Sequence, residues 1–215
     1  MSNNKSFIID DHSALLVIDI QFDFLPGGAL SVPDGDKIIT NITDFISEFH
    51  KKKGKIIFTQ DWHPKGHFSF ASAHEGKKPG DLINDLGLGP ILWPDHCVQG
   101  SHGAKIHPDL PTDLAIAIIR KGCNQKIDSY SAFLENDHQT STGLTGLLKD
   151  LEITKVFICG LALDYCCYFS AIDAKHKGFD VFFVENLTKG IDQPENSIEN
   201  ALRDMKERGI HIITY

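Results

Sequence analysis

The chain has 215 residues, a length typical of a single domain with its own apolar core. Apolar residues make up 41% of the sequence and charged residues 23%, which excludes a disordered or fibrous protein. The 29 acidic residues outnumber the 21 lysines and arginines, and this net charge of −8 argues against a nucleic-acid binder. No apolar run is long enough to cross a bilayer, and the first residues lack the pattern of a secretory signal. We therefore expect a cytoplasmic protein that forms one domain over residues 1–215, handles a small molecule, and binds neither nucleic acid nor membrane.

Six short apolar runs rich in β-branched residues predict strands. Each run is nearly continuous rather than alternating, which is typical of strands that are buried on both faces of a parallel sheet. Residues with the 3.6-residue helical period lie between several of these runs. The predicted strands cover 14–20, 55–60, 115–120, 155–160, 180–185 and 210–214, and the predicted helices cover 35–53, 164–177 and 194–208. This alternation predicts a three-layer α/β/α fold with a mostly parallel, doubly wound sheet of about six strands.

One long stretch, residues 61–113, has no clear periodicity. It holds six of the nine prolines and six of the eleven histidines. Irregular segments of this length are uncommon in compact domains and are usually functional. A surface insertion is the simpler interpretation, but the enrichment in histidine favours a metal- and substrate-binding region.

The carboxyl ends of the predicted strands carry charged and nucleophilic residues. Asp19 comes at the end of the first strand, Asp61 and His63 follow the second, Lys121 follows the third, and Cys166 follows the fourth. Ligands of open α/β sheets bind at this edge. The sequence therefore predicts an acid, metal ligands, a cation and a thiol at one site.

Cys166 is expected in the first turn of a helix, where the helix dipole and unpaired backbone N–H groups favour a thiolate. The chain has five cysteines and no CxxC pair, which is consistent with reduced thiols, one of them reactive. A lone cysteine is more often inert packing, but its place between two charged groups favours a nucleophile. Its neighbour Cys167 points about 100° away around the helix and is assigned to packing.

Asp19 and Lys121 each have an ordinary alternative, as a turn cap and as a surface lysine. At the same edge as the thiol, Asp19 can act as its acid–base partner, because partial burial raises a carboxyl pKa toward the useful range. Lys121 can hold the thiolate by charge.

The segment Asp61-Trp-His63-Pro-Lys-Gly-His67 contains three metal-ligand side chains within seven residues. With His96, they suit a divalent ion such as Zn²⁺, although Fe²⁺ and Mn²⁺ accept the same ligands. The proline after His63 disfavours helical backbone there, so we predict a loop chelate rather than a helical zinc motif. Surface histidines without a metal are the alternative.

Five ordered motifs together resemble the nicotinamidases of the isochorismatase-like cysteine hydrolase superfamily, from about residue 14 to the C-terminus. They are Asp19-Ile-Gln-Phe-Asp-Phe24, Gln60-Asp-Trp-His-Pro-Lys-Gly-His67, Trp93-Pro-Asp-His-Cys97, Lys121-Gly with Asp128-Ser-Tyr-Ser-Ala-Phe133, and Gly160-Leu-Ala-Leu-Asp-Tyr-Cys166. Leu163 and Cys167 stand where the family often has Thr and Val.

The resemblance implies a site built from several groups of residues. These are a catalytic triad of Asp19, Lys121 and Cys166; metal ligands Asp61, His63 and His96, with His67 as a direct or water-mediated contact; a ring pocket of Phe24, Trp93 and Tyr130; and an oxyanion hole from the N–H groups of Ala162 and Cys166. It also implies a cis peptide bond between Leu161 and Ala162.

The resemblance further implies hydrolysis of nicotinamide to nicotinate and ammonia through a thioester on Cys166, as a step of NAD salvage. Three alternatives stay open: a related amidase acting on another small carboxamide, a hydrolase that uses zinc-bound water, and a non-catalytic zinc-binding module. The sequence also leaves open the breadth of substrates and whether copies of the chain form a homo-oligomer.

Overall fold

A twisted six-stranded sheet forms the centre of the protein in the part of the chain that the structure describes, residues 7–83, 85 and 87–215 of a computed structural model. The strand order is β3-β2-β1-β4-β5-β6, and every neighbouring pair is parallel. The strands are β1 (Ser13–Ile18), β2 (Lys55–Asp61), β3 (Ala117–Lys121), β4 (Lys155–Leu161), β5 (Asp180–Lys189) and β6 (His211–Ile213). The doubly wound α/β fold expected from the sequence is confirmed.

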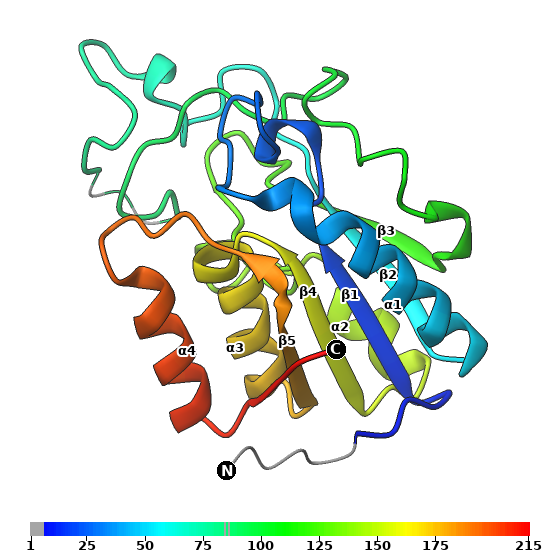
Figure 1. The fold of residues 1–215 in the computed structure, drawn as a ribbon. Coiled ribbons are helices and arrows are strands. Elements are labelled where there is room, and N and C mark those ends of the chain that lie inside the picture. The colour runs from blue at the N-terminus through cyan, green and yellow to red at the C-terminus, as the bar shows by residue number, and fades with distance from the viewer. Residues whose placement is uncertain (1–6, 84, 86) are drawn as a thin grey trace.

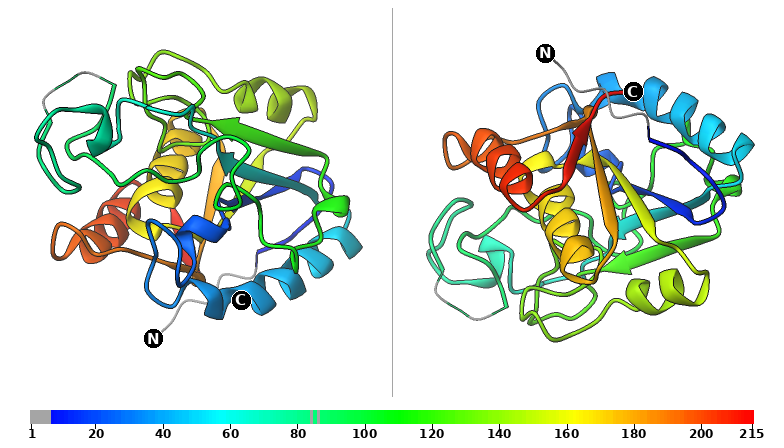
Figure 2. Two further views of the ribbon diagram at one scale, coloured as in Figure 1. Left: turned by 90° about the horizontal axis from the view of Figure 1, so that it is seen from above. Right: turned by 90° about the horizontal axis from the view of Figure 1, so that it is seen from below.

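Helices cover both faces of this sheet (Figures 1 and 2). They are α1 (Ile39–Lys51), α2 (Leu144–Asp150), α3 (Tyr168–His176) and α4 (Ser197–Glu207). The apolar side of α1 packs on one face, where Phe49 meets Phe157 of β4 with ring centroids 5.1 Å apart. The other three helices bury Leu148, Ala174 and Met205 against the opposite face. Of these helices, α2 was not predicted, because it has only seven residues and shows little periodicity.

Within the described residues, no helix is both long and apolar enough to span a membrane.

We expected every strand to be buried on both faces, but the edge strand β3 is exposed on one face. Its side chains alternate, with Ala117 and Ile119 packed against the core while Ile118 is 46% exposed. This alternation follows from the position of the strand, because the helices cover only one face of the sheet there.

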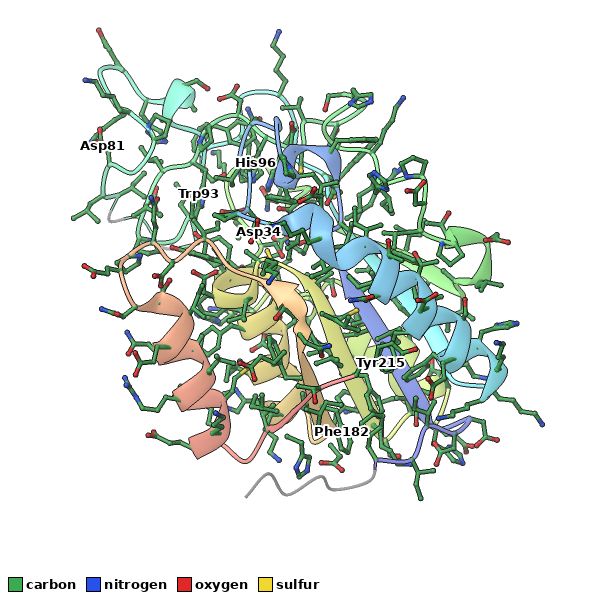
Figure 3. All side chains as sticks on the ribbon, in the orientation of Figure 1. Asp34, Asp81, Trp93, His96, Phe182 and Tyr215 are labelled. Atoms are coloured by element: carbon green, nitrogen blue, oxygen red, sulfur yellow. The ribbon has the colours of Figure 1, made fainter. Side chains whose placement is uncertain are left out.

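The order in which the chain adds strands to the sheet changes direction between β1 and β4. It runs outward from β1 to β2 and β3, then returns to the other side of β1 and runs outward again through β4, β5 and β6. Such a switch point leaves a crevice at the carboxyl ends of the central strands. The described residues of the long connection between β2 and β3 form two 3₁₀ turns, Ala71–Ala73 and Thr112–Leu114, and no helix longer than these. This connection lies over this end of the sheet (Figures 1 and 3).

Gly160 allows β4 to approach β1 closely at the switch point. Its φ is +117°, and a Cβ there would lie 2.1 Å from the carbonyl oxygen of Ile18. Gly178 also has a positive φ, of +91°, but a Cβ there would meet no atom within 4 Å.

Alanine substitutions at these two glycines distinguish the cost of backbone strain from the cost of a steric clash. We expect Gly178→Ala to lower the free energy of unfolding by about 1–2 kcal/mol, the cost of a left-handed backbone for alanine. Gly160→Ala should cost at least about 2 kcal/mol more, because the new methyl group must displace backbone atoms of β1. Urea denaturation of both variants measures the difference, and equal losses would contradict the close approach.

Candidate active site

Lys121 is the centre of a buried group of charged side chains at the carboxyl ends of the strands. Its Nζ lies 2.9 Å from Asp19 Oδ2, and it donates hydrogen bonds to Cys166 Sγ at 3.3 Å and to the carbonyl oxygen of Ser129 at 2.8 Å. It also forms an ion pair with Asp61. The structure thus brings together the acid, the lysine and the thiol that the sequence placed after three different strands.

Thr59 fixes the orientation of Asp19, a role that the sequence analysis did not predict. Asp19 follows β1 with a left-handed φ of +46°, and its amide N–H donates to Thr59 Oγ1 at 3.1 Å. The Thr59 hydroxyl in turn donates to Asp19 Oδ1 at 2.5 Å. Thr59 is part of the apolar run that forms β2, so only the pairing of β1 with β2 reveals the contact.

Burial and charge together set the protonation of these groups. Burial raises the pKa of Asp19, and the charge of Lys121 opposes only part of that change. Burial alone would lower the pKa of Lys121, but Asp19 and Asp61 raise it well above its usual range. Lys121 therefore stays a cation.

The thiol of Cys166 differs from the expectation. We predicted that Lys121 and the helix start would depress its pKa, but burial raises this pKa well above the usual value, and Lys121 offsets only part of the effect. Cys166 also lies in a π-helical turn (Leu163–Cys167) that precedes α3, not in the first turn of an α-helix. The resting residue is therefore a neutral thiol that needs a base. An Asp19 carboxylate oxygen lies within 4.8 Å of the sulfur.

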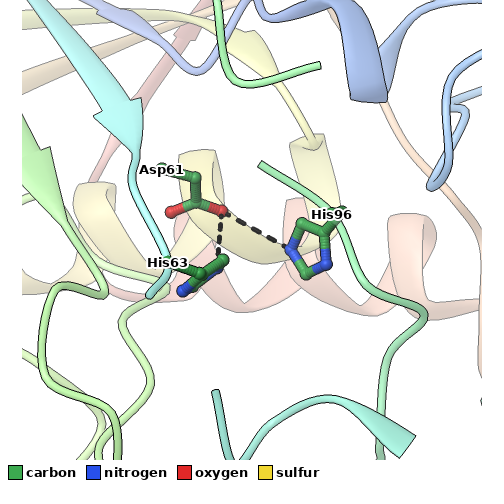
Figure 4. A group of neighbouring side chains, drawn as sticks. All are labelled: Asp61, His63 and His96. Atoms are coloured by element: carbon green, nitrogen blue, oxygen red, sulfur yellow. Dashed lines mark ion pairs between the residues drawn. The ribbon is translucent and has the colours of Figure 1, made fainter. Parts of the chain in front are cut away.

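Asp61, His63 and His96 form a second group beside the first. The Nε2 atoms of His63 and His96 lie 3.6 Å and 3.8 Å from the same oxygen of Asp61 (Figure 4). One ligand atom from each of the three residues lies within 4.8 Å of the others. Asp61 is the last residue of β2, whereas His96 comes from the long connection, so the fold joins segments that are far apart in the sequence.

The histidine rings are held in the way that metal-ligating histidines usually are. Nδ1 of His63 lies 3.0 Å from the carbonyl oxygen of Gly122, and Nδ1 of His96 lies 2.8 Å from that of Pro94. Since a carbonyl only accepts, each Nδ1 donates, so a neutral ring has its lone pair on Nε2, the atom that faces Asp61. Burial and the charge of His63 lower the pKa of His96 to about 4, which keeps that ring neutral. The donor set fits a divalent metal ion of borderline softness.

His67 lies next to this group but points elsewhere. Its ring centroid is 4.5 Å from that of His63, but its Nε2 faces the carbonyl oxygens of Asn124 and Ile127 at 2.8 and 3.2 Å. Its Nδ1 lies 2.7 Å from Ser69 Oγ. Both ring nitrogens are therefore occupied by protein partners. In this arrangement His67 belongs with His63 and Asp128 in a second possible ligand group, and it is not part of the group that Asp61 forms.

Both groups open into one cavity with an empty volume of about 350 Å³. The three residues predicted as the ring pocket, Phe24, Trp93 and Tyr130, all line it. Trp93 Nε1 donates a hydrogen bond to the Tyr130 hydroxyl at 3.1 Å, which fixes two of these walls relative to each other. The remaining lining residues are Leu30, Asp61, His96, Asp128, Ala162, Tyr165, Cys166 and Ile191. Of these, Leu30, Asp128, Tyr165 and Ile191 were not predicted as pocket residues.

The predicted oxyanion residues also face this cavity. Ala162 and Cys166 both line it, and the peptide bond between Leu161 and Ala162 is cis, as the resemblance implied. Cys167 is fully buried in the core beneath α3, as expected for a packing residue.

Comparisons with known proteins identify the family. Residues 13–215 match the model of the isochorismatase domain. The chain belongs to the isochorismatase domain family.

The chain is similar to several proteins named as nicotinamidases or pyrazinamidases. The nicotinamidase of Acinetobacter baylyi is 45% identical over 205 residues, which is 95% of this chain and 93% of the relative. The solved structure of a nicotinamidase and pyrazinamidase from Acinetobacter baumanii has a TM-score of 0.90 at 45% identity, covering 95% of this chain and 96% of that one. The pyrazinamidase of Pyrococcus horikoshii, solved in complex with zinc, has a TM-score of 0.79 at 38% identity, covering 95% and 99%.

The geometry predicts unequal roles for His96 and His67 in metal binding. His96→Ala should weaken Zn²⁺ binding at least about 100-fold, because it removes a side chain whose Nε2 faces Asp61. His67→Ala should weaken it less, by about tenfold, as expected for a residue that contacts the ring of a ligand without facing Asp61. Isothermal titration of metal-free protein with Zn²⁺ measures both. Similar losses in the two variants would make His67 a direct ligand and contradict its observed orientation.

Proposed function

We propose that this chain is a metal-dependent nicotinamidase, which hydrolyses nicotinamide to nicotinate and ammonia as a step of NAD salvage. The observation that carries the proposal is the ion pair between Lys121 and Asp61. This ion pair joins the residues around the Cys166 thiol to Asp61, His63 and His96. The proposed nucleophile and the proposed metal site therefore share one aromatic pocket. The similarity to nicotinamidases over most of the chain supports the same activity.

The first half of the reaction forms a thioester. Asp19 takes the proton of the Cys166 thiol as Sγ attacks the carboxamide carbon, and the N–H groups of Ala162 and Cys166 stabilise the oxygen that becomes negative. Asp19 then gives the proton to the amide nitrogen, the C–N bond breaks, and ammonia leaves. The raised pKa of Asp19 suits this exchange, because burial makes this carboxylate a stronger base than an exposed one, and its protonated form can return the proton.

The second half restores the enzyme. Asp19 takes a proton from a water molecule, the resulting hydroxide adds to the thioester carbon, and the C–S bond breaks. Nicotinic acid leaves and gives its carboxyl proton to solvent, which yields nicotinate, and the proton on Asp19 returns to the Cys166 sulfur. Lys121 stays protonated throughout and stabilises the sulfur anion at each stage at which it forms.

A divalent ion held by Asp61, His63 and His96 would supply a Lewis-acid contact for the ring nitrogen of the substrate. We propose Zn²⁺ as this ion, because two imidazoles and one carboxylate suit it and because the Pyrococcus horikoshii relative was solved with zinc. The aromatic walls and the ring contact together would place the amide over the sulfur. The five free cysteines, one of them the proposed nucleophile, favour a reducing compartment such as the cytoplasm.

The nucleophile assignment predicts a large and selective loss of activity. Cys166→Ala should lower ammonia release from nicotinamide by at least about 10⁴-fold, as for other enzymes that lose a covalent nucleophile. The exposed Cys123 gives a matched control, and Cys123→Ala should stay within about twofold of the unchanged protein. Zinc content of both variants is measured alongside. Substantial activity in Cys166→Ala with zinc bound would favour attack by zinc-bound water instead.

The proposed role of the metal site predicts a preference for a ring nitrogen. Benzamide keeps the ring and the carboxamide but lacks that nitrogen, so the zinc-loaded enzyme should turn it over about 10²-fold more slowly than nicotinamide. His63→Ala should remove most of this preference. Steady-state ammonia assays on both amides measure it, and equal turnover by the zinc-loaded protein would exclude the ring-nitrogen role.

A further inference from the structure

The carboxylate of Asp164, two residues before the proposed nucleophile, is buried against the segment that connects β5 to α4. Its Oδ1 accepts a hydrogen bond from the backbone N–H of Ile191 at 3.0 Å. Its Oδ2 accepts from the N–H of Asp192 at 2.9 Å and from the Ser197 hydroxyl at 2.5 Å. Hydrogen bonds to a charged acceptor are about twice as strong as neutral ones, so three of them hold this segment firmly.

Two further contacts hold the same segment. The Tyr165 hydroxyl donates a hydrogen bond to the carbonyl oxygen of Gln193. Gly190 lies so close to the carboxylate that a Cβ there would be 2.9 Å from Asp164 Oδ1 and 2.6 Å from the side chain of Ile198. The segment is therefore attached to the π-helical turn that carries Cys166, by Asp164 and by Tyr165.

The attached segment forms one wall of the substrate pocket. Ile191 and Tyr165 both line the cavity that contains Cys166, whereas the structure does not place Asp164 in that lining. We propose that Asp164 is a positioning residue that fixes Ile191 as an apolar wall of the pocket and so limits which ring substituents a substrate can carry. This inference rests on the proposed amide hydrolysis.

The expected size of the effect follows from the chemistry of apolar pockets. One methyl group more or less in such a pocket changes specificity by about 10–200-fold. This discrimination requires a wall that cannot move aside. Without the Asp164 carboxylate, the N–H groups of Ile191 and Asp192 lose their partners, and the wall can recede to make room for a substituent.

The kinetic test compares nicotinamide with nicotinamides that carry one methyl group on the ring. Asp164→Ala should lower the ratio of kcat/KM for nicotinamide over the methylated amides by about tenfold, mainly through KM, and Asp164→Asn should have a smaller effect. Asp204 is the matched control. Its carboxylate accepts a hydrogen bond from the Tyr168 hydroxyl and so joins α4 to α3, but it does not contact the segment between β5 and α4. Asp204→Ala should leave the ratio unchanged, even where it lowers the melting temperature.

A double-mutant cycle shows whether Asp164 acts through Ile191. Ile191→Ala alone should also lower the ratio. If Asp164 acts by holding this side chain, Asp164→Ala should change the ratio in the Ile191→Ala background far less than in the unchanged protein. If the effects of the two substitutions on the ratio were additive, Asp164 would not act through Ile191, and the proposal would be overturned.

Hydrogen exchange tests the attachment without any assay of activity. The backbone amides of Ile191 and Asp192 should exchange at least about tenfold faster in Asp164→Ala and remain protected in Asp204→Ala. Unchanged protection of these two amides in Asp164→Ala would overturn the proposal. So would a variant that loses kcat and stability but keeps the same ratio of kcat/KM for nicotinamide over the methylated amides. If the unchanged protein released no ammonia from nicotinamide, the proposed function would fail, and the exchange rates would still decide whether Asp164 holds the segment.

Discussion

One buried cation, the ammonium group of Lys121, holds the site together. Its Nζ contacts Asp19, Asp61 and Cys166, and the lysine side chain has no exposed surface. Removal of an isolated ammonium group from water is costly, and the two carboxylates around it, together with the carbonyl oxygen of Ser129, offset this cost. Conversely, each carboxylate depends on the lysine for its own burial. The ammonium group of Lys121 therefore holds together the proposed base, the proposed nucleophile and the first proposed metal ligand.

The sheet supplies the framework for this balance. Parallel strands direct their carboxyl ends to the same edge, and the reversal between β1 and β4 leaves that edge open for a ligand. Asp61 is paired with Lys121 in the register of β2 and β3, so strand pairing itself places the carboxylate beside the ammonium group. The irregular connection between β2 and β3 then has only to bring His96 and Trp93 over an edge that is already charged.

Much of this arrangement could be predicted from the sequence, because strand ends are visible in its apolar pattern. Asp19, Lys121 and Cys166 each follow such a run, and the parallel fold requires them to meet. Features that depend on three-dimensional surroundings could not be predicted in this way. The raised thiol pKa comes from burial, the orientation of His67 comes from carbonyl groups about sixty residues away, and the contact of Thr59 with Asp19 comes from strand register.

The ion pair between Lys121 and Asp61 has a consequence for how this protein can evolve. Asp61 belongs to two partnerships at once, as a candidate metal ligand and as a counterion of the lysine beside the thiol. A lineage that abandoned the metal by replacing Asp61 with a neutral residue would also change the charge around its nucleophile. Loss of the candidate metal ligand at this position would therefore also leave the buried ammonium group of Lys121 with one carboxylate fewer.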